Sequence, residues 1–469
     1  MAKKQNRFSG YDITTQAVHT GTDYDKETGA VRRPLHMANS YKLPDDLSKV
    51  NYSSTDLLMY SRNGNPNQHW MEEKLAALHG ADDAILLGSG VAALHALFWT
   101  LLQTGDRVVY PNVSYMAVYR LFHELFNRKF GMETVMADMT DLDAVKQAIT
   151  PGTRLVHIET PDNPTNGITD IAAVAKIAHE NGAVLSVDNT FASPYNQHPL
   201  ELGADFVVES VTKFINGHGD AQGGAILSND LETMDRIRYE AQVNVGSIIS
   251  PFNAWQIFRG SVTFPLRMER INQSTQQIAE WLEQRKNVTF VSYPGLPSNP
   301  GHEVAKKQMK NGFGGVISFG LATDDKTVEH FCAALKIVTF AVSLGHDESL
   351  IFPHPSYDER IGLYPEQFRK GFIRFSVGLE DPGDIIRDID QALVSVVCES
   401  ILVEGCEDAS RKALLLNTQQ DGRVHCSCTR PSCRCVDVLE RCADRKFPPL
   451  RVSRGLTRRC VCAMMCIYK

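Results

Sequence analysis

The first 393 residues of this chain contain almost no cysteine. Cys332 is the only one before residue 394, which argues against a disulfide framework there and fits a protein of a reducing intracellular compartment. No window approaches eighteen continuous apolar residues, and no apolar run follows the polar start, so neither a membrane span nor a secretory signal is predicted. Positive charge is not in excess either: the formal net charge is −7, and nucleic acid is not an expected partner. We therefore expect a cytoplasmic protein.

Residues 394–469 have a composition of their own. They hold ten of the eleven cysteines and more basic than acidic residues, 13 against 8. The pairs Cys426-x-Cys428 and Cys433-x-Cys435 suggest zinc, but common structural zinc sites use a Cys-x2-Cys spacing. We therefore favour a disordered or atypical extension over a metal site, and expect no metal.

Up to residue 393 short apolar strands alternate with helical patterns, which is typical of a parallel sheet covered on both faces. The region after about residue 290 reads as a second, smaller α+β unit. We predict an α/β fold with an arm (1–60), a large domain (61–255) and a smaller domain (256–393). The arm either contacts a neighbouring subunit or is a surface loop. Expected strands are 84–87, 107–110, 154–158, 183–187, 205–208, 315–321 and 372–377; expected helices are 66–79, 91–101, 119–126, 171–179, 230–240, 252–284, 325–335 and 382–393.

One of these helices begins directly after two candidate binding residues. Asn65 is a suitable N-cap, Pro66 suits the first helical position, and Gly80 ends the helix. Tyr60 and Arg62 then lie in the loop just before it. An arginine in such a loop is usually solvated, but its guanidinium can also bind phosphate.

A glycine-containing turn connects the strand at 84–87 to the next helix. In Gly88-Ser89-Gly90 the glycines fall where the strand ends, and the N–H groups of Gly90 and Val91 would open the helix. Free N–H groups and the positive end of the helix dipole bind anions. A tight turn that requires small residues is an equally good interpretation.

The stretch from Ser210 to Gly219 presents one lysine between two hydroxyl groups. Lys213 follows the strand at 205–208, with Ser210 and Thr212 beside it. Pyridoxal 5′-phosphate (PLP) enzymes need a lysine amine to hold the cofactor and hydroxyl groups to bind its phosphate. Alone, this pattern is more often an ordinary strand end.

Three polar residues follow neighbouring apolar strands: Asn163, Asp188 and Lys213. Ligands of parallel sheets lie at the carboxyl ends of the strands, so we expect these side chains to meet. A carboxylate against the pyridine nitrogen keeps PLP protonated, although an aspartate after a strand is otherwise a cap or turn residue. Their combination with the glycine turn favours PLP.

A further candidate lies in the smaller unit. Arg374 alternates with apolar residues along its strand, and Ser343 ends another segment. An inward-facing arginine needs an anion, which could be a structural carboxylate or the α-carboxylate of a substrate.

Together, residues 11–393 resemble the Cys/Met metabolism family of PLP enzymes, which includes cystathionine γ-synthase, cystathionine γ-lyase, methionine γ-lyase and O-acylhomoserine sulfhydrylases. The resemblance implies the type I fold of PLP-dependent transferases (aspartate-aminotransferase-like), with a mostly parallel seven-stranded sheet in the large domain. It rests on the strings Ala17-Val-His-Thr-Gly21, Tyr60-Ser-Arg62, Asn65-Pro66, Ser89-Gly90, Glu159-Thr-Pro-Asp-Asn163-Pro164, Val187-Asp188-Asn-Thr-Phe191, Gly203-Ala-Asp205, Ser210-Val-Thr-Lys213, Gly217-His218, Arg259-Gly260, Ser343-Leu-Gly345 and Arg374-Phe-Ser-Val-Gly-Leu-Glu-Asp381.

The resemblance also implies roles for the matching residues. Lys213 would carry the cofactor and then act as the base, and Asp188 would pair with the pyridine nitrogen. Tyr115 would stack on the ring and help the γ-substituent to leave. A neighbouring subunit would supply Tyr60 and Arg62, so the active unit would be a homodimer at least, and the family is usually tetrameric. The phosphate would be held by Gly90, Val91, Ser210 and Thr212, and the substrate carboxylate by Asn163, Ser343 and Arg374.

Departures from the family pattern bear on the substrate. Tyr115 is followed by Met116 rather than the glycine common in the family, and Tyr357 lies where the family has a Met-Thr-His string. Val342 stands where members that handle cystathionine tend to carry a glutamate for a second amine. This apolar residue resembles the methionine γ-lyase pattern and favours γ-elimination, giving a 2-oxo acid and ammonia. The alternative is γ-replacement by a transferase.

Overall fold

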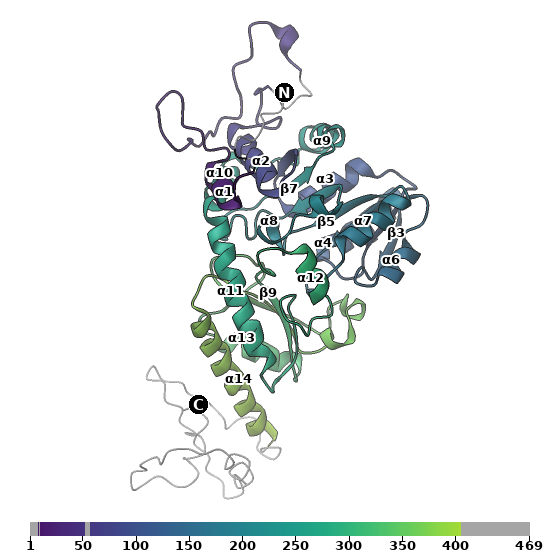
Figure 1. The fold of residues 1–469 in the computed structure, drawn as a ribbon, viewed down its shortest axis with the longest axis vertical. Helices are drawn as coiled ribbons and strands as arrows, with labels where there is room; N and C mark the ends of the chain where they lie inside the picture. The colour runs from purple at the N-terminus through teal and green to yellow at the C-terminus, as the bar shows by residue number, and fades with distance from the viewer. Residues whose placement is uncertain (1–7, 9, 52–56, 405–469) are drawn as a thin grey trace, which may run out of the picture.

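A computed structural model describes residue 8, residues 10–51 and residues 57–404 of the chain (Figure 1). A seven-stranded sheet dominates the first half, in the order β1-β7-β6-β5-β4-β2-β3. Only β7 runs antiparallel to its neighbours β1 and β6, so the predicted mostly parallel sheet is confirmed. The strands are β1 (Asp83–Leu87), β2 (Arg107–Pro111), β3 (Glu133–Ala137), β4 (Thr153–Glu159), β5 (Val184–Asp188), β6 (Phe206–Glu209) and β7 (Gly224–Ser228).

A five-stranded sheet forms the second unit, as the sequence indicated. Its order is β10-β11-β12-β9-β8, and it is antiparallel except between β10 and β11. In Figure 1 it lies below the large sheet, with α11, α13 and α14 along one side. Its strands are β8 (Val288–Ser292), β9 (Val316–Leu321), β10 (Thr339–Phe340), β11 (Leu350–His354) and β12 (Phe372–Ser376). Arg374 lies at the centre of β12, paired with Phe352 on one side and Ser318 on the other.

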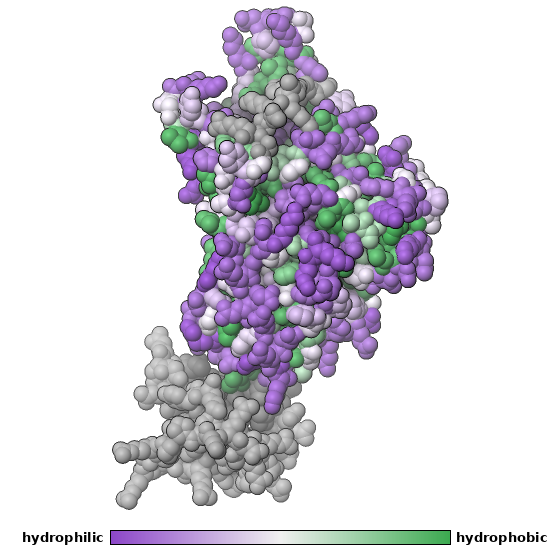
Figure 2. Space-filling model, viewed as in Figure 1, coloured by the Kyte–Doolittle hydropathy of each residue, from purple (hydrophilic) through white to green (hydrophobic). Residues whose placement is uncertain are grey.

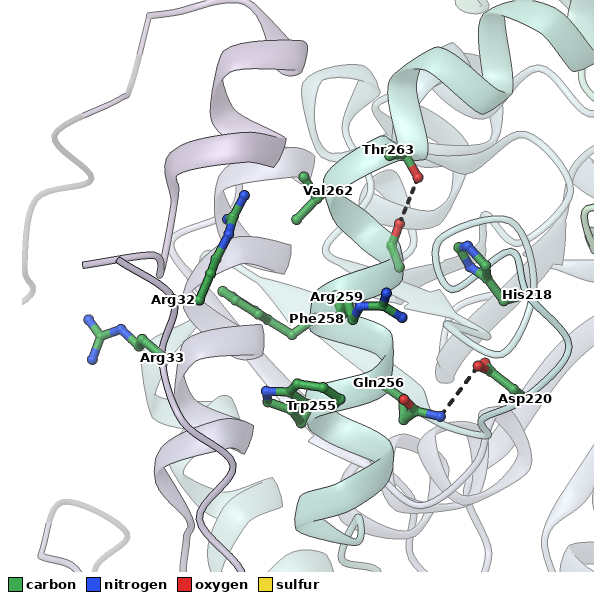
Figure 3. Close-up of a pocket in the computed structure, with 11 residues that line it drawn as sticks. Arg32, Arg33, His218, Asp220, Trp255, Gln256, Phe258, Arg259, Val262 and Thr263 are labelled. Atoms are coloured by element: carbon green, nitrogen blue, oxygen red, sulfur yellow. Dashed lines mark hydrogen bonds between the residues drawn. The ribbon is translucent and has the colours of Figure 1, made fainter. Parts of the chain in front are cut away.

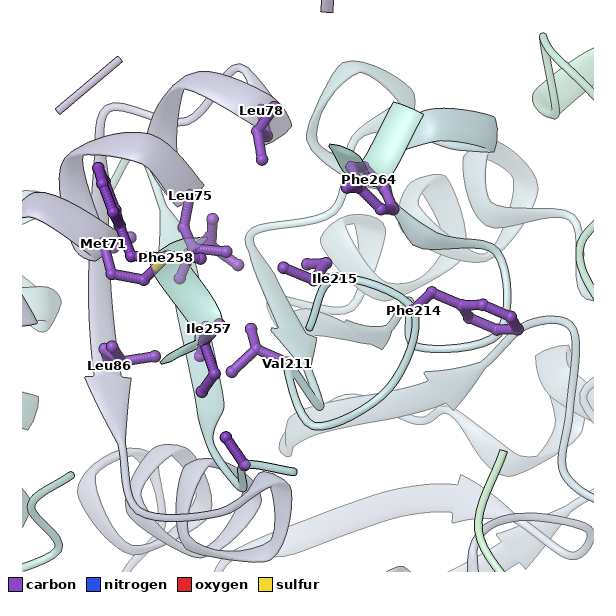
Figure 4. Close-up of a cluster of buried hydrophobic side chains, with 14 of the residues drawn as sticks. Met71, Leu75, Leu78, Leu86, Val211, Phe214, Ile215, Ile257, Phe258 and Phe264 are labelled. Atoms are coloured by element: carbon purple, nitrogen blue, oxygen red, sulfur yellow. The ribbon is translucent and has the colours of Figure 1, made fainter. Parts of the chain in front are cut away.

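Helices cover both faces of the large sheet. Side chains that alternate along β6 belong to different cores: Val207 packs with residues of α2 and α10, while Phe206 and Val208 pack with α3. All three are buried, which explains why this strand is apolar throughout. Figure 4 shows the first of these cores, where Met71, Leu75 and Leu78 of α2 face Ile257 and Phe258 of α10. The helices of this unit are α1 (Ile13–His19), α2 (Pro66–His79), α3 (Gly90–Leu101), α4 (Met116–Arg120), α5 (Asn127–Phe130), α6 (Leu142–Ala148), α7 (Ile171–Glu180), α8 (Ser193–Asn196), α9 (Leu231–Ile237) and α10 (Pro251–Gly260).

The expected single helix at 252–284 is wrong, because the structure divides it. Helix α10 ends at Gly260, a 3₁₀ turn spans Ser261–Thr263, and α11 (Phe264–Glu283) follows. Pro265 lies in the first turn of α11. A proline has no N–H and its ring clashes with the carbonyl four residues earlier, so a continuous helix is broken at this point.

Two segments near the ends of the fold differ from the expectations. The arm, for which no helix was expected, contains α1, whose Ala17 is fully buried in the core with α2. Beyond α1 the arm runs along α2, where the Arg33 guanidinium lies 4.4 Å from the centre of the Trp70 ring and the His36 N–H donates to Asn67 Oδ1. Helix α14 (Pro382–Glu404) continues past residue 393, and the rest of the cysteine-rich extension lies outside the described residues. The remaining helices are α12 (His302–Gln308) and α13 (Asp325–Ala334).

The visible surface is mostly polar. Figure 2 shows hydrophilic residues over most of this face, with smaller apolar groups between them. Within the described ranges, no helix combines the length and the apolar character needed to cross a membrane.

Candidate active site

Lys213 lies in the turn after β6, at the carboxyl edge of the large sheet. Its backbone N–H donates to the Ser210 carbonyl (3.1 Å), and its carbonyl accepts from Gly217 (2.8 Å), which holds the turn. Its Nζ donates to Ser343 Oγ of the smaller unit at 2.7 Å. Burial, and secondarily the nearby Arg374 guanidinium, lowers the pKa of Lys213 to about 8. A substantial fraction of this amine is therefore neutral and nucleophilic near physiological pH.

Arg374 connects the two sheets at this point. Its Nη1 donates to Asn163 Oδ1 and its Nη2 to the Ser343 carbonyl, both at 3.0 Å. Burial lowers the pKa of the guanidinium to about 10. Both partners are neutral oxygen atoms, so the positive charge remains to be balanced by an anion such as an α-carboxylate. The structure therefore brings Asn163, Ser343, Arg374 and Lys213 together, and their binding roles stay predictions.

Three buried carboxyl groups end three adjacent strands of the large sheet. Glu159 ends β4, Asp188 ends β5 directly opposite it in the register, and Glu209 ends β6. Burial raises the pKa of all three groups, and the charge of Asp188 raises the pKa of both glutamates further. Hydrogen bonds from Thr190 partly offset the effect of burial at Asp188. Sequence reasoning identified Asp188 and missed the two glutamates, although each also follows an apolar strand.

Tyr115 lies beside these carboxyl groups. It is the N-cap of α4, and its backbone N–H donates to Glu159 Oε2 at 2.7 Å. Burial, followed by the charges of Glu159 and Asp188, raises the pKa of its phenol, so this side chain is held in the protonated form. Tyr115 is 43% exposed in the single chain and is therefore accessible to a ligand.

The start of α3 lies against the Lys213 turn. Ser89 is the N-cap, with its Oγ accepting from Ala92, and the first N–H groups of the helix belong to Gly90 and Val91. A Cβ at Gly90 would come within 2.9 Å of Ser210 Cβ and 3.0 Å of its Oγ, so only glycine permits this approach. The arrangement offers N–H groups and a hydroxyl to one anion.

Thr212 occupies this region with its hydroxyl already engaged. Its Oγ1 donates to the Gly223 carbonyl at 3.1 Å and accepts from the Gly223 N–H at 3.0 Å. This hydroxyl secures the Lys213 turn to the residue before β7. Its expected contact with phosphate stays a prediction.

Tyr60 and Arg62 lie on the surface before α2. Both are exposed, and the Arg62 guanidinium is 5.4 Å from the centre of the Tyr60 ring. Gln242 donates to the carbonyls of Asn63 (3.0 Å) and Arg62 (3.5 Å), which fixes the loop. As predicted, Asn65 caps α2 by accepting from the Asn67 N–H. Within this chain the cation near Lys213 is Arg374, and a contribution of Arg62 from a second subunit stays a prediction.

A cavity of about 380 Å³ lies apart from these residues (Figure 3). Arg32 and Arg33 of the arm border it on one side, and Trp255 and Arg259 of α10 on another. None of the predicted site residues lines it. The described residues contain no cluster of three or more histidine, cysteine or acidic side chains that could hold a metal.

A lysine, a buried carboxylate and a helix N-terminus at the carboxyl edge of a mainly parallel sheet define the site of a PLP-dependent enzyme. Residues 14–394 match the family described as "Cys/Met metabolism PLP-dependent enzyme". The chain belongs to this family, whose enzymes depend on PLP and act as lyases or transferases of sulfur amino-acid metabolism.

Several proteins are similar to the chain over nearly their whole length. Canavanine gamma-lyase of Pseudomonas canavaninivorans is 47% identical over 397 residues, covering 84% of this chain and 99% of that protein. L-methionine gamma-lyase of Fusobacterium nucleatum subsp. polymorphum is 38% identical, covering 82% and 99%. The structure of MetB from Corynebacterium glutamicum, 39% identical, superimposes with a TM-score of 0.76, covering 82% of this chain and 99% of that one. The predicted family and fold class are confirmed.

The residues present fit the cofactor of the family. The carboxyl group of Asp188, buried at the end of β5, offers a partner for a cationic pyridine nitrogen, and a cation there would offset the burial that raises its pKa. The close approach of Gly90 and Ser210 leaves N–H and hydroxyl groups for a phosphate. When bound, PLP supplies an electron-withdrawing ring that stabilises negative charge at the Cα of an amino acid.

Proposed function

We propose that the protein is a γ-elimination lyase acting on an amino acid with a sulfur or other leaving group at Cγ. Its products are a 2-oxo acid, ammonia and the leaving group. The residue that favours γ-elimination over γ-replacement is Val342, because an apolar side chain next to Ser343 cannot pair with the second amine of cystathionine. The two relatives named canavanine gamma-lyase, 47% and 46% identical, support the same class of reaction.

The contacts around Arg374 support a role in orienting the substrate. The guanidinium binds the α-carboxylate, and Asn163 and the Ser343 carbonyl hold that guanidinium in place. The same Ser343 places its hydroxyl 2.7 Å from Lys213 Nζ. The Cα of a substrate held by Arg374 is thus brought towards the lysine that removes its proton.

Other residues act on the leaving group and the cofactor. The raised phenol pKa of Tyr115 keeps a proton available for the departing γ-substituent. Lys213 and Asp188 would hold the cofactor ring, and Gly90, Val91, Ser210 and Thr212 would hold its phosphate. Val342 and Tyr357 are 68% and 78% exposed, so the leaving-group side is open in the single chain.

Measurement of 2-oxobutanoate and of the released γ-substituent tests the proposal. The substrates are methionine, homocysteine, O-acetylhomoserine and canavanine, each with and without added cysteine. We expect release of the γ-substituent and oxo acid from at least one of them without cysteine. Product formation only when cysteine is added would contradict elimination and establish the transferase.

γ-Replacement is the second candidate because other relatives are named for a synthase reaction. Cystathionine gamma-synthase of Mycobacterium tuberculosis is 39% identical, covering 81% of this chain and 96% of that protein. It would use the same Lys213 and Arg374 contacts and differ in the nucleophile that enters at Cγ. The assays with cysteine separate the two reactions.

We also propose that the enzyme works in the cytoplasm as a homodimer at least, and as a homotetramer in its full assembly. The exposed Tyr60 and Arg62 support this, because both are free to reach the phosphate of a neighbouring subunit. Mixing inactive Lys213→Ala and Arg62→Ala chains tests it. Recovery of activity in the mixture is expected if one subunit supplies Arg62 to the other, and no recovery would contradict a shared site.

A further inference from the structure

Three side chains form a connected line that starts at Lys213. Lys213 Nζ donates to Ser343 Oγ at 2.7 Å, and the same oxygen lies 3.3 Å from Nε2 of His346. With the hydroxyl oxygen accepting from the lysine, the hydroxyl proton is free to be donated to His346. His346 is the only one of the three without an expected role.

The backbone holds this line in place. Ser343 has a φ of 81°, a conformation rare for residues other than glycine, and its carbonyl accepts from Arg374. Two residues later, Gly345 has a φ of 70° and donates to Ser376 Oγ at 2.9 Å. A Cβ at Gly345 would lie 2.7 Å from the backbone nitrogen of Phe214, so this turn packs directly on the Lys213 segment. Ser343 thus combines a strained backbone with contacts to Arg374 of the small sheet and to Lys213 after the large sheet. Strain of this kind is typical of functional sites, which indicates that the position of the Ser343 hydroxyl is important for function.

Charges of both signs act on His346. Burial, followed by the charge of Lys213, lowers the pKa of its imidazole, and the carboxylates of Glu348, Asp347 and Asp220 act in the opposite direction. Burial, followed by the charge of Arg374, lowers the pKa of Lys213 as well. Nδ1 of His346 faces Gly219, where an added Cβ would lie 2.8 Å away, and the ring is partly exposed to solvent.

We propose that His346 is a positioning residue that orients the Ser343 hydroxyl and carries protons between Lys213 and solvent. The protonated amine of Lys213 gives a proton to Ser343 Oγ while the hydroxyl proton passes to His346 Nε2. The imidazolium then releases its Nδ1 proton to water, so no charge remains on Ser343 and no oxidation occurs. The proposal rests on the proposed role of Lys213 as the base, but is independent of what leaves from Cγ.

Solvent exchange at Cα tests it without any γ-substituent. The holoenzyme is incubated with L-alanine in D₂O, and NMR follows the replacement of the Cα proton by deuterium. We expect His346→Gln to slow exchange about tenfold, at the lower end of acid–base effects, and to change its pH profile. His179→Gln is the matched control, because His179 pairs with Asp205 at the opposite edge of the sheet. Unchanged exchange and an unchanged pH profile in His346→Gln would overturn the proposal.

Two further measurements distinguish this role from a structural one. Added imidazole should restore exchange in His346→Gly and leave the unsubstituted enzyme unaffected. In a Ser343→Ala background, His346→Gln should have no additional effect, because the connection to Lys213 is already broken. Additive losses, or no rescue by imidazole, would contradict the proton path.

The absorbance of the bound cofactor gives a readout that does not depend on turnover. It reports whether the nitrogen that joins Lys213 to the cofactor is protonated. When the Ser343 hydroxyl donates to His346, its oxygen becomes a better acceptor for the N–H of the nitrogen that joins Lys213 to the cofactor. Without His346 this acceptor is weaker, so in His346→Gln that nitrogen should lose its proton, and the absorbance should change, at a lower pH. A transition at the same pH would show that His346 does not act on Lys213. Failure of the γ-elimination assays alone would leave all of these outcomes unaffected.

Discussion

The guanidinium of Arg374 donates to the side-chain oxygen of Asn163 at 3.0 Å, although 211 residues separate them in the sequence. Arg374 lies on β12 of the small sheet, whereas Asn163 follows β4 of the large sheet. The contact therefore brings a cation from one unit to the carboxyl edge of the other, where Lys213 lies. The site depends on the correct placement of the two sheets.

Arg374→Lys should impair use of amino-acid substrates. A lysine ammonium cannot make the two separate contacts to Asn163 and Ser343 and also bind a carboxylate in a planar, two-pronged arrangement. We expect kcat/KM to fall by an amount equivalent to about 2–5 kcal/mol, mainly through KM. The control is Arg369→Lys, which replaces an arginine that donates to backbone carbonyls outside the site. Equal kcat/KM values for the two variants would contradict the carboxylate role.

Lys213 should react as an amine at lower pH than an ordinary lysine. Burial and Arg374 lower its pKa to about 8, so its neutral fraction should rise to one half near that pH. Labelling of protein freed of PLP with an amine-selective reagent, followed by mass spectrometry, measures this at Lys213. In the denatured chain the midpoint should return to about 10.4, the usual lysine value. The same midpoint in the folded and denatured chains would contradict the prediction.

Gly217→Ala should prevent correct folding of the Lys213 turn. Gly217 has a φ of 68°, and a Cβ there would collide with the Arg267 guanidinium, which donates to the carbonyls of Phe214 and Ile215. Gly246 is the control that separates backbone strain from a steric clash. Its φ is also positive, at 85°, but a Cβ added there would meet no other atoms. We expect Gly246→Ala to cost about 1–2 kcal/mol and Gly217→Ala clearly more. Thermal unfolding measures both, and equal losses would show that the collision is relieved without cost.

Lys74 should make stability depend on pH. This fully buried lysine donates to the Ala17 carbonyl at 2.8 Å, and its Nζ lies 3.9 Å from the centre of the Phe258 ring. Burial, followed by the charge of Arg32, lowers its pKa to about 7. Between pH 7 and about 10.4 the unfolded chain therefore binds more protons than the folded one, so stability rises with pH by up to about 1.4 kcal/mol per unit.

Substitution of Lys74 by methionine should remove this contribution. Urea unfolding at pH 7.5 and 9.5 should show a smaller increase in the free energy of unfolding for Lys74→Met than for the unsubstituted protein. Lys176→Met, at an exposed position on α7, is the control and should keep the full increase. An equal increase in all three proteins would show that Lys74 is not responsible.

Local patterns in the sequence were sufficient for the main strands of the large sheet and for several site positions. Asp188 and Lys213 could be placed because each follows an apolar strand, and parallel strands end at one edge. The division of the helix at Pro265 was also open to local reasoning, since proline breaks a continuous helix. Two strands of the large sheet were missed. The side chains of the edge strand β3 are only partly buried and carry a weaker apolar signal, whereas β7 is buried throughout and was missed although its Ala-Ile-Leu run is apolar.

The sequence by itself thus determined the family and the cofactor and predicted the lysine, because these depend on motifs of adjacent residues. Only the tertiary structure showed that Ser343 contacts Lys213 across 130 residues, that His346 continues this contact, and that Glu159 and Glu209 flank Asp188. The contacts to Ser343 require a particular packing of the two sheets, and the carboxyl cluster requires the lateral register of β4, β5 and β6. Neither is specified by residues that are close in the chain, so both became visible only once the chain was folded.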